Sequence, residues 1–189
     1  MLSIKLRRFL RDERGVAAIE FAYALPILIT ILMGTFEAGR FILLHQKLDR
    51  ASTSVADLVT QESSLTAAML EDFYLAAERQ TMPFDLPTEG RVFVSSVTLQ
   101  DVDEEPEVIW QCNGGGALTG QTSVIGTEGG EADLPSTFPL VQGENTIVAE
   151  VLYSYEPFLF DGIFEPQIFR HTSYTKPRLD DLVNKPAGC

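Results

Sequence analysis

The chain has 189 residues, which is enough for one modest folded domain and too few for a large multidomain enzyme. Its composition of 45% hydrophobic, 10% aromatic and 22% charged residues indicates a packed core and excludes disordered, collagenous and disulfide-dense proteins. The net charge of -13 argues against nucleic acid as a partner, because affinity for nucleic acid comes mainly from Lys and Arg at the phosphates.

The charge is distributed very unevenly along the chain. The first fifteen residues carry five basic and two acidic side chains. Residues 51–169 carry twenty acidic side chains, and their only basic ones are Arg79 and Arg91. This asymmetry indicates that the two ends of the chain lie in different environments.

Residues 16–36 contain a single charge, Glu20, in an otherwise mostly apolar run. As an α-helix this segment would be about 31 Å long, which matches the hydrocarbon thickness of a bilayer and predicts a transmembrane helix. A buried core helix is the alternative, although a small domain rarely needs one that is apolar on all sides. Basic residues before the span and acidic ones after it predict a cytoplasmic N-terminus and a periplasmic or otherwise extracytoplasmic C-terminal part.

Helical periodicity continues beyond the span, over residues 37–60. Its apolar positions repeat at spacings of three and four, and they are Leu44, Leu48, Ala51, Val55 and Leu58. We expect this juxtamembrane stalk to lay one side against the folded domain. Glu37 and Arg40 are spaced to pair on one helix face, and a solvated face is an equally good interpretation. Within the span, Pro26 removes one backbone hydrogen bond, which predicts a kink.

A second amphipathic helix is predicted over residues 64–80. The buried stripe is expected at Leu65, Met69, Phe73 and Ala76 or Ala77, and Pro83 and Pro87 end the helix. From Gly90 the apolar pattern changes to period two, which predicts a strand there and further strands at 107–111, 146–155 and 168–175. The glycine-rich stretch 113–143 is expected to be a surface loop. The fold class is therefore α+β, with an antiparallel sheet.

No cofactor, metal or catalytic site is predicted. The run Gly114-Gly115-Gly116 lacks the Lys-Ser/Thr of a phosphate-binding loop. The acidic run at 101–105 lacks the spacing of a calcium-binding loop, so a solvated turn is favoured over a Ca²⁺ site. His45 and His171 are too few for a usual zinc site, and Gly-x-Ser-x-Gly is absent. The sequence does not predict an enzyme.

The chain has two cysteines, Cys112 and Cys189. Two cysteines in an extracytoplasmic domain usually form one disulfide, and we expect these two to pair. Free thiols and an intermolecular bond are the alternatives. A bridge would tie the C-terminal tail to the rest of the domain.

The sequence around the start of the span carries the most specific pattern. It reads Arg14-Gly15-Val16-Ala17-Ala18-Ile19-Glu20-Phe21-Ala22, then Leu25-Pro26, Gly34, Glu37, Gly39-Arg40 and Leu48-Asp49-Arg50-Ala51. This segment resembles the class III signal sequence of type IV pilins and pseudopilins. Over about residues 11–60 it is similar to the TadE family, pseudopilins that act in assembly of the Tad (tight adherence, Flp) pilus.

The resemblance implies several expectations. A prepilin peptidase would cut between Gly15 and Val16, removing residues 1–15 and leaving a mature chain of 174 residues. Glu20, with Phe21 beside it, would set the register of subunits during assembly. Glu37 and Arg40 would meet other assembly components. The implied partners are the peptidase, other Tad pilins and pseudopilins, and inner-membrane platform proteins.

The expected organisation has four parts. Residues 1–15 are a cleaved leader, 16–36 the transmembrane helix, 37–60 the stalk, and 61–189 a periplasmic domain with a pilin-like sheet. The chain is larger than a short major pilin, so a minor pseudopilin in the bacterial inner membrane fits best. The alternative is a signal-anchored periplasmic binding or enzymatic domain unrelated to pili, in which the pattern from Gly15 to Glu20 is accidental.

Overall fold

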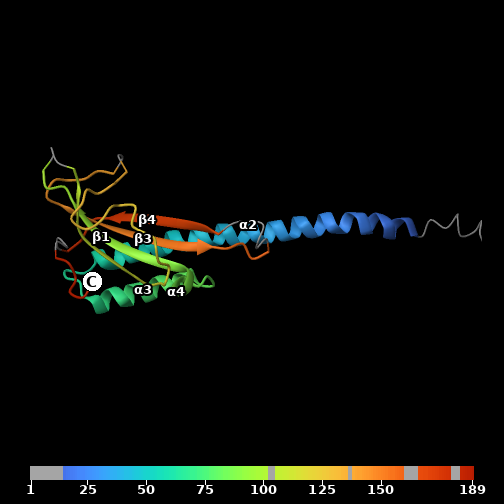
Figure 1. Cartoon of the computed structure of the whole chain (residues 1–189), viewed down its shortest axis with the longest axis horizontal. Coiled ribbons are helices and arrows are strands. Elements are labelled where there is room, and N and C mark those ends of the chain that lie inside the picture. The colour runs from blue at the N-terminus through green and yellow to red at the C-terminus, as the bar shows by residue number, and fades with distance from the viewer. Residues whose placement is uncertain (1–14, 102–104, 136–137, 160–165, 180–183) are drawn as a thin grey trace, which may run out of the picture. The chain divides into compact units, whose positions relative to one another are not determined.

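The structure is a computed structural model that describes residues 15–101, 105–135, 138–159, 166–179 and 184–189. The elements are helices α2 (Val16–Thr60), α3 (Ala67–Thr81) and α4 (Leu86–Glu89), and strands β1 (Gly90–Thr98), β2 (Glu107–Gly114), β3 (Asn145–Tyr155) and β4 (Gln167–Thr175) (Figure 1). The predicted α+β class is confirmed, and each predicted strand is present. The chain divides into two compact units, Met1–Phe41 and Ile42–Cys189, here called unit 1 and unit 2.

The four strands of unit 2 form one antiparallel sheet in the order β2-β1-β3-β4. Val94 at the middle of β1 lies between Cys112 of β2 and Ala149 of β3. The ladder between β1 and β2 is interrupted by an irregularity at Ser96/Val97. The two central strands, β1 and β3, are therefore covered by neighbours on both edges.

The main core lies between one face of the sheet and the helices. The C-terminal part of α2 and helix α3 pack onto that face, and the core residues include Leu48, Val55, Leu70, Val94, Trp110, Ile147 and Val151. The stalk face is confirmed at Leu44, Leu48, Ala51 and Val55, which are all buried. The prediction was wrong at Leu58, which is half-buried, because the helical step of four from Val55 leads to the fully buried Val59.

Helix α3 is present, and its predicted inner face was partly right: Ala77 is buried, and Leu65 and Phe73 are partly buried and pack against the core. Its buried side chains are Leu70, Tyr74, Ala77 and Thr81. Leu70 and Tyr74 take the inner positions predicted for Met69 and Phe73, one residue later and a rotation of about 100° around the helix. The helix also begins at Ala67, after the Thr66 cap, and not at Ser64. Glycines allow the aromatic ring of Tyr74 inside: a Cβ at Gly114 would lie 2.4 Å from its Cε2.

The glycine-rich stretch after β2 has little regular structure, as predicted, but part of it is not a surface loop. Ile125 and Ala132 are buried with Val97, Val108 and Val148 in a second, smaller core on the face of the sheet opposite the helices. β1 therefore lacks the burial alternation expected of a one-sided sheet, since both of its faces are covered.

Candidate functional site

The predicted cleavage pair lies at the very start of helix α2. The helix begins at Val16, directly after Gly15, and both residues are exposed. A Cβ placed on Gly15 would meet no atom within 4 Å, and the same holds for Gly34 and Gly39 further along the helix. Packing among the described residues therefore does not explain these three glycines. The remainder of the predicted leader, residues 1–14, lies outside the described part of the chain.

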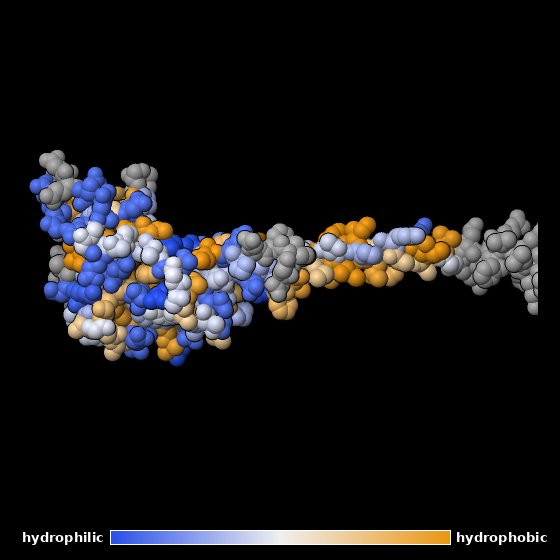
Figure 2. All heavy atoms as spheres, viewed as in Figure 1, coloured by the Kyte–Doolittle hydropathy of each residue, from blue (hydrophilic) through white to orange (hydrophobic). Residues whose placement is uncertain are grey.

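Glu20 lies one helical turn after Val16, so the two residues share a face of α2. Every residue from Gly15 to Leu32 is exposed, including Phe21 at 60%. Apolar side chains run along this part of α2 in Figure 2. The helix is long and apolar enough to cross a membrane, and its most apolar window is not buried. An exposed helix of this kind needs lipid or other chains around it.

Helix α2 runs through Pro26 without a break. Two hydroxyls of this segment are satisfied inside the helix: Thr30 Oγ1 donates to the Pro26 carbonyl over 2.9 Å, and Thr35 Oγ1 donates to the Ile31 carbonyl over 2.8 Å. These bonds remove two polar groups from contact with an apolar surround. The kink at Pro26 stays a prediction.

The predicted juxtamembrane pair, Glu37 and Arg40, lies in the next two turns of α2. Both side chains are half-buried, unlike those of the preceding apolar stretch. Their mutual pairing and their contact with assembly components remain predictions.

A cluster that the sequence did not predict joins the stalk to the edge strand β4. His45 Nδ1 of α2 lies 2.9 Å from His171 Nε2 of β4. The other ring nitrogen of His171, Nδ1, lies 3.8 Å from Asp49 Oδ1. The His45 ring also packs on Phe169, with 4.6 Å between ring centroids. The two histidines are 126 residues apart, so only the strand register brings them together.

The environment of His171 disfavours its charged form. Burial lowers the pKa of His171 below its ordinary value of 6.5, and the neighbouring His45 lowers it further, while Asp49 opposes both effects. Because two imidazolium ions repel at this distance, the contact requires at least one neutral ring.

This cluster predicts a pH-dependent stability of unit 2. A lowered pKa in the folded state means that the contribution of His171 is complete above pH 6.5 and is lost as the pH falls through the lower, folded-state pKa. We expect the urea midpoint of the full chain in detergent, followed by Trp110 fluorescence, to fall between about pH 7 and 5. In His171→Gln this fall should be smaller, and an equal fall in both proteins would contradict the assignment.

Two other features of unit 2 hold segments that are distant in sequence together. The predicted disulfide between Cys112 and Cys189 is present, with 5.4 Å between the Cα atoms. Glu150 is completely buried, and it accepts hydrogen bonds from Arg170 Nη1 over 2.6 Å, from the Val124 amide over 3.1 Å and from the Ser123 hydroxyl. The sequence of β3 does not reveal this role of Glu150, because the partners come from a distant loop and from β4.

Among the described residues, no group of three or more His, Cys, Asp or Glu side chains is arranged to hold a metal ion. Residues 102–104 of the acidic run fall outside this part of the chain. Asp101 and Glu105, which flank the gap, are both exposed.

Comparison with known proteins gives a match to a family model. Residues 15–57 match the sequence model of the family described as TadE-like protein. No curated protein matches the chain. No solved structure matches it either. The resemblance to TadE-like proteins is therefore confirmed over residues 15–57, which include most of helix α2.

Proposed function

We propose that this chain, which matches the TadE-like family at residues 15–57, is a minor pseudopilin that acts in assembly of the Tad (Flp) pilus. The observation that carries the proposal is the coincidence of that match with an exposed apolar helix that begins directly after Gly15. A prepilin peptidase cuts between Gly15 and Val16, and residues 16–36 anchor the product in the bacterial inner membrane.

Cleavage gives the helix a new chemical group. The freed Val16 amine is an ammonium ion at neutral pH, and Glu20 lies one turn away on the same face. In the low-dielectric membrane an unpaired carboxylate is costly, so Glu20 has a strong tendency to find a cation. We assign that cation to the Val16 ammonium of a neighbouring subunit, which would set the axial register between two helices.

The open surface of α2 supports this assembly role. Gly34 and Gly39 have no neighbour within 4 Å of a Cβ position, although glycine weakens a helix. Small residues allow another helix to approach closely in a membrane. Other Tad pilins, pseudopilins and inner-membrane platform proteins are the proposed partners along this surface.

Unit 2 belongs in the periplasm in this proposal. The basic leader favours a cytoplasmic N-terminus by the positive-inside rule, which places the residues after the span outside the cytoplasm. The Cys112–Cys189 disulfide suits an oxidising compartment. A folded unit of this size also exceeds what a filament built mainly of short helices requires, which favours a minor component.

Substitution of Glu20 tests the role directly. In a strain that lacks the chromosomal copy, we expect Glu20→Gln and Glu20→Ala to abolish surface pili, while the amount of protein in the membrane stays unchanged. Glu20→Asp, which keeps the charge, should restore pili at least partly. Thr30→Val, a neutral change in the same exposed helix, is the matched control. Normal piliation with Glu20→Gln would contradict the assignment.

A further inference from the structure

Unit 2 has one end at which several of its elements meet. Gly90 pairs with Tyr153 and Tyr155 pairs with Gln167, so the start of β1, the end of β3 and the start of β4 lie together. The segment after α3 reaches the same end, because the Phe84 ring packs on Tyr153 with 5.9 Å between centroids. The first turns of α2 within unit 2 lie there too, through the contact of His45 with Phe169.

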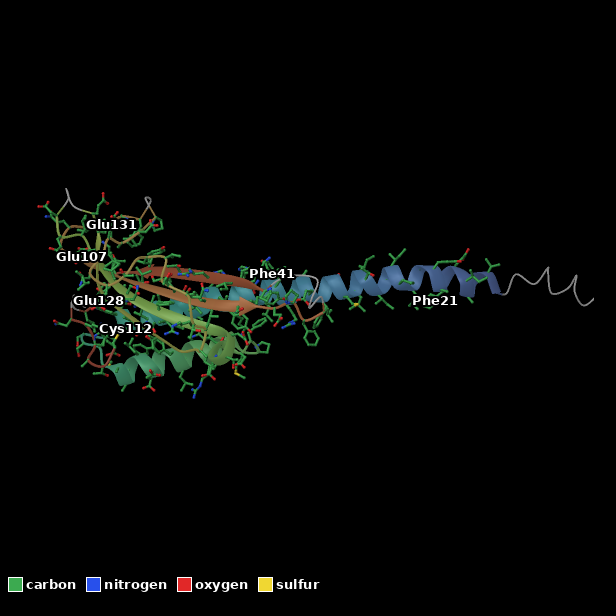
Figure 3. The ribbon with its side chains drawn as sticks, viewed as in Figure 1. Phe21, Phe41, Glu107, Cys112, Glu128 and Glu131 are labelled. Carbon is green, nitrogen blue, oxygen red and sulfur yellow. A yellow bond between two sulfur atoms is a disulfide. The ribbon has the colours of Figure 1, made fainter. Side chains whose placement is uncertain are left out.

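This end, here called the entry end, exposes large apolar side chains from four segments. The exposed fractions are 56% for Ile42, 63% for Met82, 68% for Phe158 and 42% for Ile168. The opposite end contains the end of β1, the start of β2 and the loop that bridges to Glu107. It is acidic, with Glu107, Glu128 and Glu131 gathered there (Figure 3). Val141 is exposed on the acidic side, in the turn whose Gly143 bonds to Leu99.

We propose that the entry end of unit 2 rests in the headgroup layer of the bilayer that the same chain spans. This inference depends on the proposed membrane anchoring by residues 16–36. Ile42 follows Phe36 by six positions, and six steps along the chain span about 9 Å as a helix and no more than about 22 Å fully extended. Chain length alone therefore keeps the entry end within reach of the membrane surface.

The chemistry of the entry end fits the membrane–water interface better than it fits the surface of a second protein. Four partly exposed side chains present on the order of 400 Å² of apolar surface, about half of what one partner contributes to a stable protein interface. Phe, Met and Ile side chains partition into the boundary between headgroups and acyl chains. Asp85 and Glu156, both exposed at this end, limit the depth to the headgroup layer.

Fluorescence quenching by brominated lipid tests the proposal on the full chain reconstituted in vesicles. The chain has one Trp, the fully buried Trp110, which provides a constant background. We expect Trp introduced by Phe158→Trp or Met82→Trp to be quenched by phosphatidylcholine brominated near the headgroup, several-fold more than Trp introduced by Val141→Trp. Quenching of Phe158→Trp no greater than that of Val141→Trp would overturn the proposal.

Two further readings separate the possible failures. Ile29→Trp lies within the proposed span and must be quenched by lipid brominated deep in the acyl chain, so its failure refutes the anchoring itself. If Ile29→Trp is quenched and Phe158→Trp is not, the anchoring stands and only the contact with the headgroup layer is refuted. A blue shift of Phe158→Trp emission that grows with protein density, without quenching, assigns the entry end to a second copy of the chain and equally overturns the proposal.

Discussion

Glu150→Leu is expected to lower the free energy of unfolding of unit 2 by about 3–5 kcal/mol. The carboxylate is completely buried and holds Arg170 together with the Ser123–Val124 loop. Its loss leaves the guanidinium of Arg170 and the Ser123 hydroxyl without their buried acceptor, which costs more than the missing attraction itself. Urea unfolding of the full chain in detergent, followed by Trp110 fluorescence, measures the change.

A surface ion pair in the same unit provides the control. Lys176 Nζ lies 2.7 Å from Glu144 Oε2, and the two side chains are 41% and 51% exposed. Glu144→Ala should therefore cost less than about 1 kcal/mol. The double variant Glu150→Leu with Arg170→Leu should recover part of the stability that Glu150→Leu loses, because no unpaired charge remains. If Glu150→Leu and Glu144→Ala lower the urea midpoint equally, the buried pair does not contribute to stability as proposed.

Removal of the disulfide is expected to have an effect of similar size. The bridge joins residues 77 apart, so the chain-entropy relation gives about 4.5 kcal/mol for its loss. Cys189→Ser is the suitable variant, because Cys189 is exposed whereas Cys112 is buried within the sheet core. We expect a strongly lowered urea midpoint, read by Trp110 fluorescence.

The reduced wild-type protein is the matched comparison for this variant. It should unfold at the same urea concentration as Cys189→Ser, since both lack only the covalent link. An unchanged midpoint in both would show that the bridge does not restrict the unfolded chain as proposed.

The elements that could be predicted are those with a local signal. Period-two alternation located all four strands, and the spacing of Leu44, Leu48, Ala51 and Val55 placed the inner face of the stalk. The inner face of α3 was predicted only in part, because its main contact is with a residue far away in sequence. Tyr74 turns inward against Gly114, a residue 40 positions away, and no pattern within the helix reports that space.

The same distinction applies to the functional residues. Gly15, Val16 and Glu20 lie within six residues of one another, so their spacing indicated the resemblance to TadE-like proteins without knowledge of the fold. The contact of His45 with His171 and the hydrogen bonds to Glu150 depend on which strands pair and on which loop crosses the sheet. No spacing of residues within one segment of the sequence indicates either set of contacts. The disulfide could be predicted because the chain has only two cysteines, so that only one intramolecular pairing is possible.

The most direct measurement is the N-terminal sequence and intact mass of the protein purified from membranes of cells with and without their prepilin peptidase. We expect a chain that starts at Val16 when the peptidase is present, and one that retains Gly15 and the residues before it when the peptidase is absent. Retention of the leader in both strains would contradict processing, and it would favour a signal-anchored periplasmic domain unrelated to pili.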